Sequence, residues 1–303
     1  MKKIIALVLV LTLSLFCFAA CKKDKGGNDN NNGNGGNTPT EKTYTLSIAV
    51  DSVVDENNKV TNTVAVLLLD ESNKIVAVRL DTAETTITVE NNEVVDANVT
   101  SKVELGDGYP MTAGSFAKQT KAFEDYIVGK TADEVTNLDT ALISGCTMPK
   151  SPTSFKVAIA KAFATANKIT FKTSETVTLG AAISMSVSGG KASADFAGTV
   201  LAGGKVVAAI LDSCERTFTV ADGVATADDY TGTKADKGDN YTMPKGNWLN
   251  QAKAFANSAV GKTTADLVNL ETVSDALASA GCTMEFTTAG YKATLIKAAG
   301  NAR

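Results

Sequence analysis

The stretch GDGYPMTAGSFAKQTKAFEDYIVGKTADEVTNLDT, at residues 106–140, occurs a second time as GDNYTMPKGNWLNQAKAFANSAVGKTTADLVNLET at residues 238–272. The two segments align without a gap and agree at 16 of 35 positions. Their offset of 132 residues indicates a duplicated domain, because the repeats of a solenoid are only about 20–50 residues long. We therefore predict two copies of one fold, at residues 43–168 and 169–303.

The agreement extends beyond this stretch on both sides. Upstream, LDTAETTITV at residues 80–89 matches LDSCERTFTV at residues 211–220. Downstream, GCTM at residues 145–148 returns at residues 281–284, after a four-residue insertion in the second copy. The match therefore covers most of each copy.

Within each copy, strand patterns come first and helix patterns follow. Segments such as TVAVLLLD and KIVAVRLD are rich in β-branched residues and are separated by turn sequences such as DENN and DESN, which is typical of antiparallel strands. Phe116, Phe123 and Ile127 then share one helix face, and Thr131 and Glu134 form a capping-box pattern for a shorter helix. This order predicts the α+β class, with two tandem antiparallel-sheet domains and C-terminal helices.

The first 20 residues have the pattern of an export signal. A basic start at residues 1–3 precedes an apolar run at residues 4–20, which is short for a membrane-spanning helix of about 20 residues. The run ends in FAAC at residues 18–21, which resembles a bacterial lipobox. We therefore expect cleavage before Cys21 and attachment of a diacylglyceryl lipid to its sulfur. An uncleaved N-terminal anchor is the alternative.

Residues 21–42 connect this signal to the first copy. After Cys21 they are almost all Gly, Asn and small polar residues, which cannot bury enough apolar surface to offset the entropy of ordering. We expect a disordered tether that holds the folded part near a membrane. The expected localisation is extracytoplasmic, lipid-anchored to the cell membrane or the cell surface.

Composition excludes several classes of function. The chain has no histidine, so histidine-dependent triads and histidine-ligated metal sites are excluded. The net charge of −4 argues against nucleic acid as a partner. After Cys21 there are three cysteines, Cys146, Cys214 and Cys282, and the chain has no CxxC pair. We predict no metal site, no disulfide framework and no catalytic residue.

Two carboxylates recur near the end of a strand in each copy. They are Asp81 with Glu84, and Asp212 with Glu215. Such a pair could bind a cation or act as acid and base. A solvated rim of the sheet is the interpretation that the pattern favours.

The segments ISGCTM (143–148) and SAGCTM (279–284) are the candidate binding site. Each precedes the final helix of its copy by a few residues. A helix N-terminus offers free N–H groups and the positive end of a dipole, which favours phosphate. The predicted binding residues are Ser144, Gly145, Cys146 and Thr147 in the first copy and Gly281, Cys282 and Thr283 in the second.

These segments give the chain a resemblance to a known family. Apolar strands, then S-G-x-T, then an amphipathic helix resemble the FMN-binding domain of bacterial electron-transfer flavoproteins. In that family a flavin transferase attaches FMN through its phosphate to the threonine of a D-x-x-[ST]-G-A-T signal. The resemblance implies FMN, covalently held by Thr147 and Thr283. It covers about the last 25 residues of each copy and is faint elsewhere.

The chain departs from that signal at several positions. Cys146 and Cys282 stand where the family has alanine, and Ala280 replaces the first Ser or Thr. The nearest upstream acid, Asp139 or Asp275, lies eight residues before the threonine instead of six. These departures put recognition by a flavin transferase in doubt.

The sequence leaves two possible functions open. The first is a membrane-anchored, extracytoplasmic FMN carrier that accepts electrons from a membrane donor and relays them to extracellular acceptors. The second is a non-enzymatic surface lipoprotein with cofactor-free duplicated domains that binds a small ligand or an envelope partner. If the chain has redox activity, the flavin supplies that chemistry and the protein supplies position and electrostatics.

Overall fold

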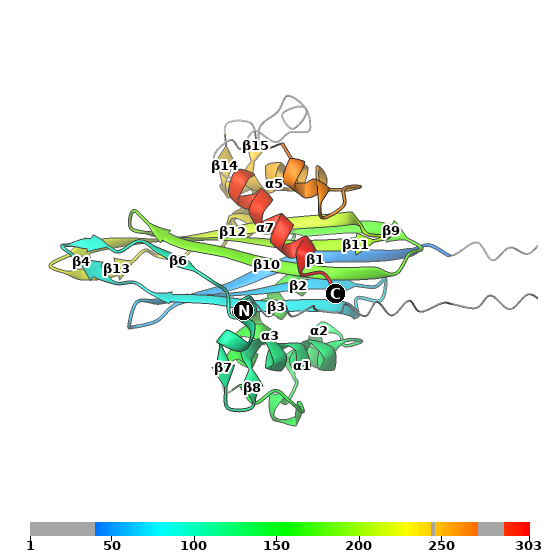
Figure 1. The fold of residues 1–303 in the computed structure, drawn as a ribbon, viewed down its shortest axis with the longest axis horizontal. Helices are drawn as coiled ribbons and strands as arrows, with labels where there is room; N and C mark the ends of the chain where they lie inside the picture. The colour runs from blue at the N-terminus through cyan, green and yellow to red at the C-terminus, as the bar shows by residue number, and fades with distance from the viewer. Residues whose placement is uncertain (1–39, 149, 244–245, 272–287) are drawn as a thin grey trace, which may run out of the picture. The chain divides into compact units, whose positions relative to one another are not determined.

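The structure is a computed structural model that describes residues 40–148, 150–243, 246–271 and 288–303. These residues belong to one compact unit, in which two antiparallel sheets pack face to face (Figure 1). In each copy the long strands precede the main helices. The predicted α+β class with antiparallel sheets is therefore confirmed.

The first sheet has the strand order β3-β2-β1-β9, and the second has the order β13-β12-β11-β10-β6. The strands of the first sheet are β1 (Lys42–Val54), β2 (Lys59–Leu69), β3 (Ile75–Thr86) and β9 (Lys168–Thr173). Those of the second are β6 (Ala97–Val99), β10 (Val177–Ser188), β11 (Lys191–Ala202), β12 (Lys205–Ala221) and β13 (Val224–Ala227). Short hairpins pair β4 (Val89–Glu90) with β5 (Glu93–Val94), β7 (Pro110–Met111) with β8 (Gly114–Ser115), and β14 (Thr242–Met243) with β15 (Gly246–Asn247).

The helices lie in the second half of each copy. Those of the first copy are α1 (Phe116–Ile127), α2 (Ala132–Thr136) and α3 (Ser151–Ala164). Those of the second are α4 (Lys234–Lys237), α5 (Trp248–Asn257) and α7 (Thr288–Gly300). Four 3-10 turns lie at Gly106–Gly108, Thr140–Leu142, Gly238–Asn240 and Asp266–Asn269.

Two local predictions about these helices are confirmed. Phe116, Phe123 and Ile127 form part of the buried face of α1. Thr131 and Glu134 form the expected capping box of α2, in which each side chain accepts from the backbone N–H of the other residue. Both features follow from local sequence alone.

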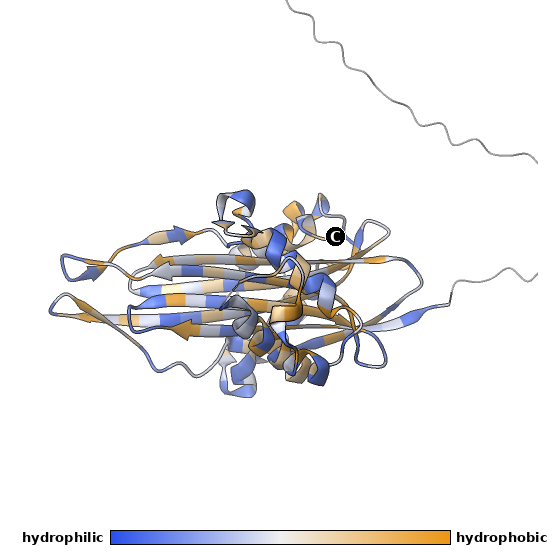
Figure 2. Ribbon diagram, turned by 90° about the horizontal axis from the view of Figure 1, so that it is seen from below, coloured by the Kyte–Doolittle hydropathy of each residue, from blue (hydrophilic) through white to orange (hydrophobic). Residues whose placement is uncertain are grey.

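The layers of the unit follow from the two-residue period of a strand. In β2, Val66 and Leu68 point into the core between the two sheets, whereas Ala65 and Leu67 point toward the helices. Helices α1 and α3 cover the outer face of the first sheet, and α5 and α7 cover the outer face of the second (Figure 1). Hydrophobic and hydrophilic residues are interspersed along the strands (Figure 2). Because each sheet has the other sheet on one face and helices on the opposite face, its central strands are buried on both faces.

Two strand pairings tie the repeated sequences together. β9 begins at the division that the sequence predicts between the copies, follows α3 and pairs with β1. β6, which precedes α1 in the first copy, pairs with β10 of the second sheet. β9, at the start of the second copy, is thus an edge strand of the first sheet, and β6 of the first copy pairs at the edge of the second sheet.

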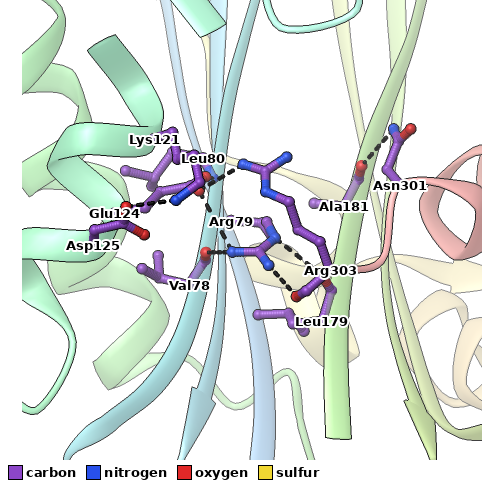
Figure 3. Close-up of polar contacts among 10 residues, drawn as sticks. All are labelled: Val78, Arg79, Leu80, Lys121, Glu124, Asp125, Leu179, Ala181, Asn301 and Arg303. Carbon is purple, nitrogen blue, oxygen red and sulfur yellow. Dashed lines mark hydrogen bonds and ion pairs between the residues drawn. The ribbon is translucent and has the colours of Figure 1, made fainter. Parts of the chain in front are cut away.

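A buried ion cluster joins the two copies at a seam between β3 and β10 (Figure 3). Glu124 of α1 accepts from the guanidinium groups of Arg79, at 3.5 Å, and Arg303, at 2.8 Å, and from the backbone N–H of Leu80, at 2.8 Å. Arg79 also donates to the carbonyl oxygens of Leu179 and Arg303. The segment after α7 is thereby held against the first copy.

Close packing of α7 on β10 gives the first prediction. A Cβ at Gly180 would overlap the carbonyl oxygen of Ala298 in α7. We expect Gly180→Ala to lower the free energy of unfolding by about 1–3 kcal/mol, because the helix must move away from the strand. The control is Gly108→Ala, whose Cβ would meet nothing within 4 Å. Equal urea midpoints for the two variants would contradict this packing.

Candidate functional site

Glu84, near the end of β3, lies among three donors. Its Oε2 atom is 2.9 Å from Nζ of Lys59 and 2.9 Å from Nζ of Lys102. The hydroxyl of Tyr109 donates to Oε1 at 3.2 Å. Burial raises the pKa of Glu84, but the two ammonium groups outweigh burial and hold its pKa below the usual value. We call these four residues the Glu84 cluster.

Lys102 is the buried member of the Glu84 cluster. Its residue is only 9% exposed, and its ammonium group lies 4.9 Å from the ring centre of Tyr109 and 5.3 Å from that of Phe116. The electron-rich faces of the two rings attract a cation at these distances. An ammonium group has three donors, and among the described residues Glu84 is the one hydrogen-bond acceptor within reach.

A cavity of about 340 Å³ opens beside the Glu84 cluster. It lies on the helix-facing side of the first sheet, past the apolar core of that layer. Its lining is strongly polar. The lining residues are Asp51, Val53, Asp55, Lys59, Thr61, Thr63, Thr82, Glu84, Lys102, Tyr109, Lys150, Ser151 and Ser154.

A buried carboxylate fixes the segment that carries Lys102. Asp81 accepts from the hydroxyl of Ser101 at 2.6 Å and from the backbone N–H of Val103 at 3.0 Å. These partners flank Lys102 on both sides. Burial raises the pKa of Asp81 to about 6. Asp81 therefore positions the segment that carries the site lysine.

The second copy repeats this arrangement. Lys234 lies 2.8 Å from Glu215, and its ammonium group lies 5.6 Å from the ring centre of Tyr241. Asp212 accepts from the backbone N–H groups of Ser213, at 2.7 Å, and Ala235, at 3.1 Å. An aspartate, a glutamate, a lysine and a tyrosine therefore lie close together in both copies. They are Asp81, Glu84, Lys102 and Tyr109 in the first copy and Asp212, Glu215, Lys234 and Tyr241 in the second.

The second copy has one additional carboxylate. Asp195 is paired with Ser213 across β11 and β12, at the position that Thr63 holds opposite Thr82 in the first copy. Burial raises the pKa of Asp195 to about 6, while the charge of Lys234 acts in the opposite direction. The second copy therefore has a carboxylate near Lys234 that the first copy does not have near Lys102.

The predicted segment at residues 143–148 forms a turn before α3. Cys146 is buried, whereas Ser144, Gly145 and Thr147 are exposed. Thr147 donates from its backbone N–H and its hydroxyl to Oε1 of Gln119, at 2.7 and 3.1 Å. Gly145 has φ of +79°, a conformation that favours glycine. The turn therefore presents the side chain of Thr147 at the surface.

Cys146 has its side chain in the core between the first sheet and its helices. Burial raises the pKa of its thiol. A small apolar residue such as alanine would suit this environment too, so this departure from the family signal leaves the turn intact. The residues of the turn thus fit a phosphoester on Thr147. Gly281, Cys282, Thr283 and Cys21 lie outside the described residues.

Two features of the site differ from the sequence interpretation or were missed by it. Asp81 and Asp212 are 6% and 1% exposed, so they are not at a solvated rim of the sheet. Lys102 and Lys234 were not identified as site residues. Extending the alignment upstream at the same offset places Ser101-Lys102 on Thr233-Lys234, which is the signal that could have found them.

The described residues contain no group of three side chains suited to a metal ion. Within them, no helix is long and apolar enough to cross a membrane. Comparison with known proteins gives no family: no family model, no curated protein and no solved structure matches this chain.

Proposed function

We propose that this chain is a lipid-anchored, extracytoplasmic flavin carrier that holds FMN through Thr147. The observation that carries the proposal is the exposed turn before α3, in which Gln119 fixes the backbone and hydroxyl of Thr147. A hydroxyl held in one place at the surface is accessible to a modifying enzyme. The flavin would supply one- and two-electron redox chemistry, and the protein would supply its position and electrostatics.

The chain's own residues would hold and orient the phosphate. Lys150 follows Thr147 by three positions and precedes α3, whose first turn has no side-chain cap. The free N–H groups of that turn and the ammonium of Lys150 favour an anion there. Gln119 restricts rotation of Thr147. Gln119 has a buried counterpart, Gln251, in the second copy.

The proposal includes the partners that the sequence implies. Cys21, carrying a diacylglyceryl group, would join the protein to a membrane, and residues 22–42 would give it reach toward a membrane electron donor. A flavin transferase would load Thr147, and Thr283 in the second copy. Extracellular acceptors would take the electrons.

The test is the absorption spectrum and intact mass of residues 22–303, produced with a flavin transferase and secreted. We expect yellow protein that loses one FMN mass in Thr147→Ala and keeps it in Thr153→Ala, an exposed threonine of α3. Thr283→Ala separately reports on the second copy. If Thr147→Ala leaves the flavin content unchanged, attachment at Thr147 is wrong.

A second candidate function is a cofactor-free surface module that binds a small ligand. The cavity beside the Glu84 cluster favours it, because ligand sites are commonly concave, with a few convergent polar groups. Colourless protein of unmodified mass would favour this second function over the flavin carrier.

A further inference from the structure

Within the Glu84 cluster, beside the cavity, the formal charges do not cancel. Lys59 and Lys102 share one carboxylate, that of Glu84, which leaves one positive charge over. Asp51 is already paired with Lys161, at 3.2 Å. The cavity wall beside Glu84 is therefore cationic.

The remaining charged lining residues, Asp55 and Lys150, carry opposite charges. Oδ1 of Asp55 accepts two backbone N–H groups of its own turn, from Asn57 at 2.9 Å and Lys59 at 3.0 Å. Lys150 has no ion-pair partner within the part of the chain that the structure describes. It stands beside the uncapped first turn of α3. An anionic group entering the cavity would meet Lys150, Lys59 and Lys102.

The rest of the lining can hold the body of a small molecule. Five hydroxyl groups line the cavity, and they belong to Thr61, Thr63, Thr82, Ser151 and Ser154. The ring of Tyr109 forms an apolar wall. The volume of about 340 Å³ lies within the range of small-molecule sites.

The second copy provides an internal comparison. There Glu215 pairs with Lys234, and Asp195 adds a half-buried carboxylate where the first copy has Thr63. Lys191, the counterpart of Lys59, is exposed and makes no ion pair among the described residues. Two carboxylates therefore lie near Lys234, and Lys237 lies 5.6 Å from the ring centre of Tyr241. The added carboxylate of Asp195 disfavours an anion beside Lys234.

We propose that the cavity of the first copy binds a small molecule through a carboxylate or phosphate group, held by Lys102, Lys59 and Lys150, and that the second copy binds the same molecule more weakly. This inference rests on the second candidate function and not on the flavin. Thr147 is not among the lining residues.

The experiment uses residues 22–303, which retain the whole compact unit, produced without a flavin transferase. Inorganic phosphate and succinate are titrated separately at constant ionic strength, and amide chemical shifts are followed by NMR. We expect saturable shifts at the segments around Lys102 and Lys150 with at least one of the two anions. The anion that binds identifies whether the natural group is a phosphate or a carboxylate.

The variants are taken from the chain's own duplication. Thr63→Asp introduces the residue of the second copy, and Lys59→Gln removes a cation at a partly exposed position that the fold tolerates. Each is expected to weaken binding at least about tenfold. Lys59→Gln loses a hydrogen bond to a charged group, and Thr63→Asp adds a negative charge that repels the anion. Lys191→Gln, the matched control in the second copy, leaves binding unchanged.

Two results would overturn the proposal. One is the absence of saturable shifts with either anion. The other is binding that survives undiminished in both Thr63→Asp and Lys59→Gln. Thr147→Ala is expected to bind the anion as the unaltered protein does, so failure of the flavin proposal and failure of this one are separate outcomes.

Discussion

Replacing Glu124 by alanine is expected to lower the free energy of unfolding by about 3–5 kcal/mol. The side chain of Glu124 is 2% exposed and that of Arg79 is 14% exposed, so the change leaves a guanidinium buried without its counter-ion. It also removes the acceptor of the Leu80 N–H. Arg303 loses its contact across the seam as well. Urea unfolding at neutral pH measures the loss.

The control for this variant is the next residue of α1. Asp125 is exposed and pairs with Lys121, so Asp125→Ala is expected to change the unfolding free energy by less than about 0.5 kcal/mol. If Glu124→Ala lowers the free energy of unfolding by no more than Asp125→Ala does, the ion cluster at the seam contributes no stability.

The second copy indicates how the loss can be repaired. At the positions of Arg79 and Glu124 it has Ile210 and Ala256. Burial already raises the pKa of Glu124, so desolvation outweighs the attraction of the two arginines. The double variant Arg79→Ile, Glu124→Ala therefore removes both charges together and is expected to be more stable than Glu124→Ala alone.

The α+β class and the buried face of α1 could be predicted because each depends on the local sequence pattern. Face-to-face packing of the two sheets could not be predicted with the same certainty. The run TVAVLLL in β2 is apolar at successive positions, and such a run fits a strand buried on both faces or a buried helix. Only the tertiary structure shows that Val66 and Leu67 lie in two different cores.

The site shows a second limit of sequence interpretation. The sequence pattern places Asp81 near the end of a strand, where an aspartate is most often exposed. In the structure Asp81 lies within β3 and is buried, and it accepts from Ser101 and Val103 where the chain passes from β6 toward α1. That contact brings Lys102 to Glu84 across 18 residues of sequence. The pattern of one strand cannot predict such a contact. Alignment of the two copies points to the lysine, because Lys102 recurs as Lys234.

The counterpart of Asp81 in the second copy gives the other large prediction. Asp212 is 1% exposed, and burial raises its pKa from 3.8 to about 7. The charge of Asp236 acts in the same direction, and hydrogen bonds from Thr233, Ser213 and Ala235 oppose it. Folding therefore favours the protonated carboxyl. This contribution to stability is complete below pH 3.8 and is lost as the pH rises toward 7.

Asp212→Asn is expected to remove this loss, because asparagine cannot ionise and its carbonyl oxygen can still accept from Ser213 and Ala235. The gain in unfolding free energy over the unaltered protein should grow from pH 4 to pH 8 by up to about 4 kcal/mol. Urea unfolding at several pH values measures it, with the exposed Asp229→Asn as the control. The sole tryptophan, Trp248, packs in the same copy and reports unfolding by fluorescence. If the gain does not depend on pH, Asp212 is ionised over the whole range. Its hydrogen bond to the backbone beside Lys234 then does not change with pH.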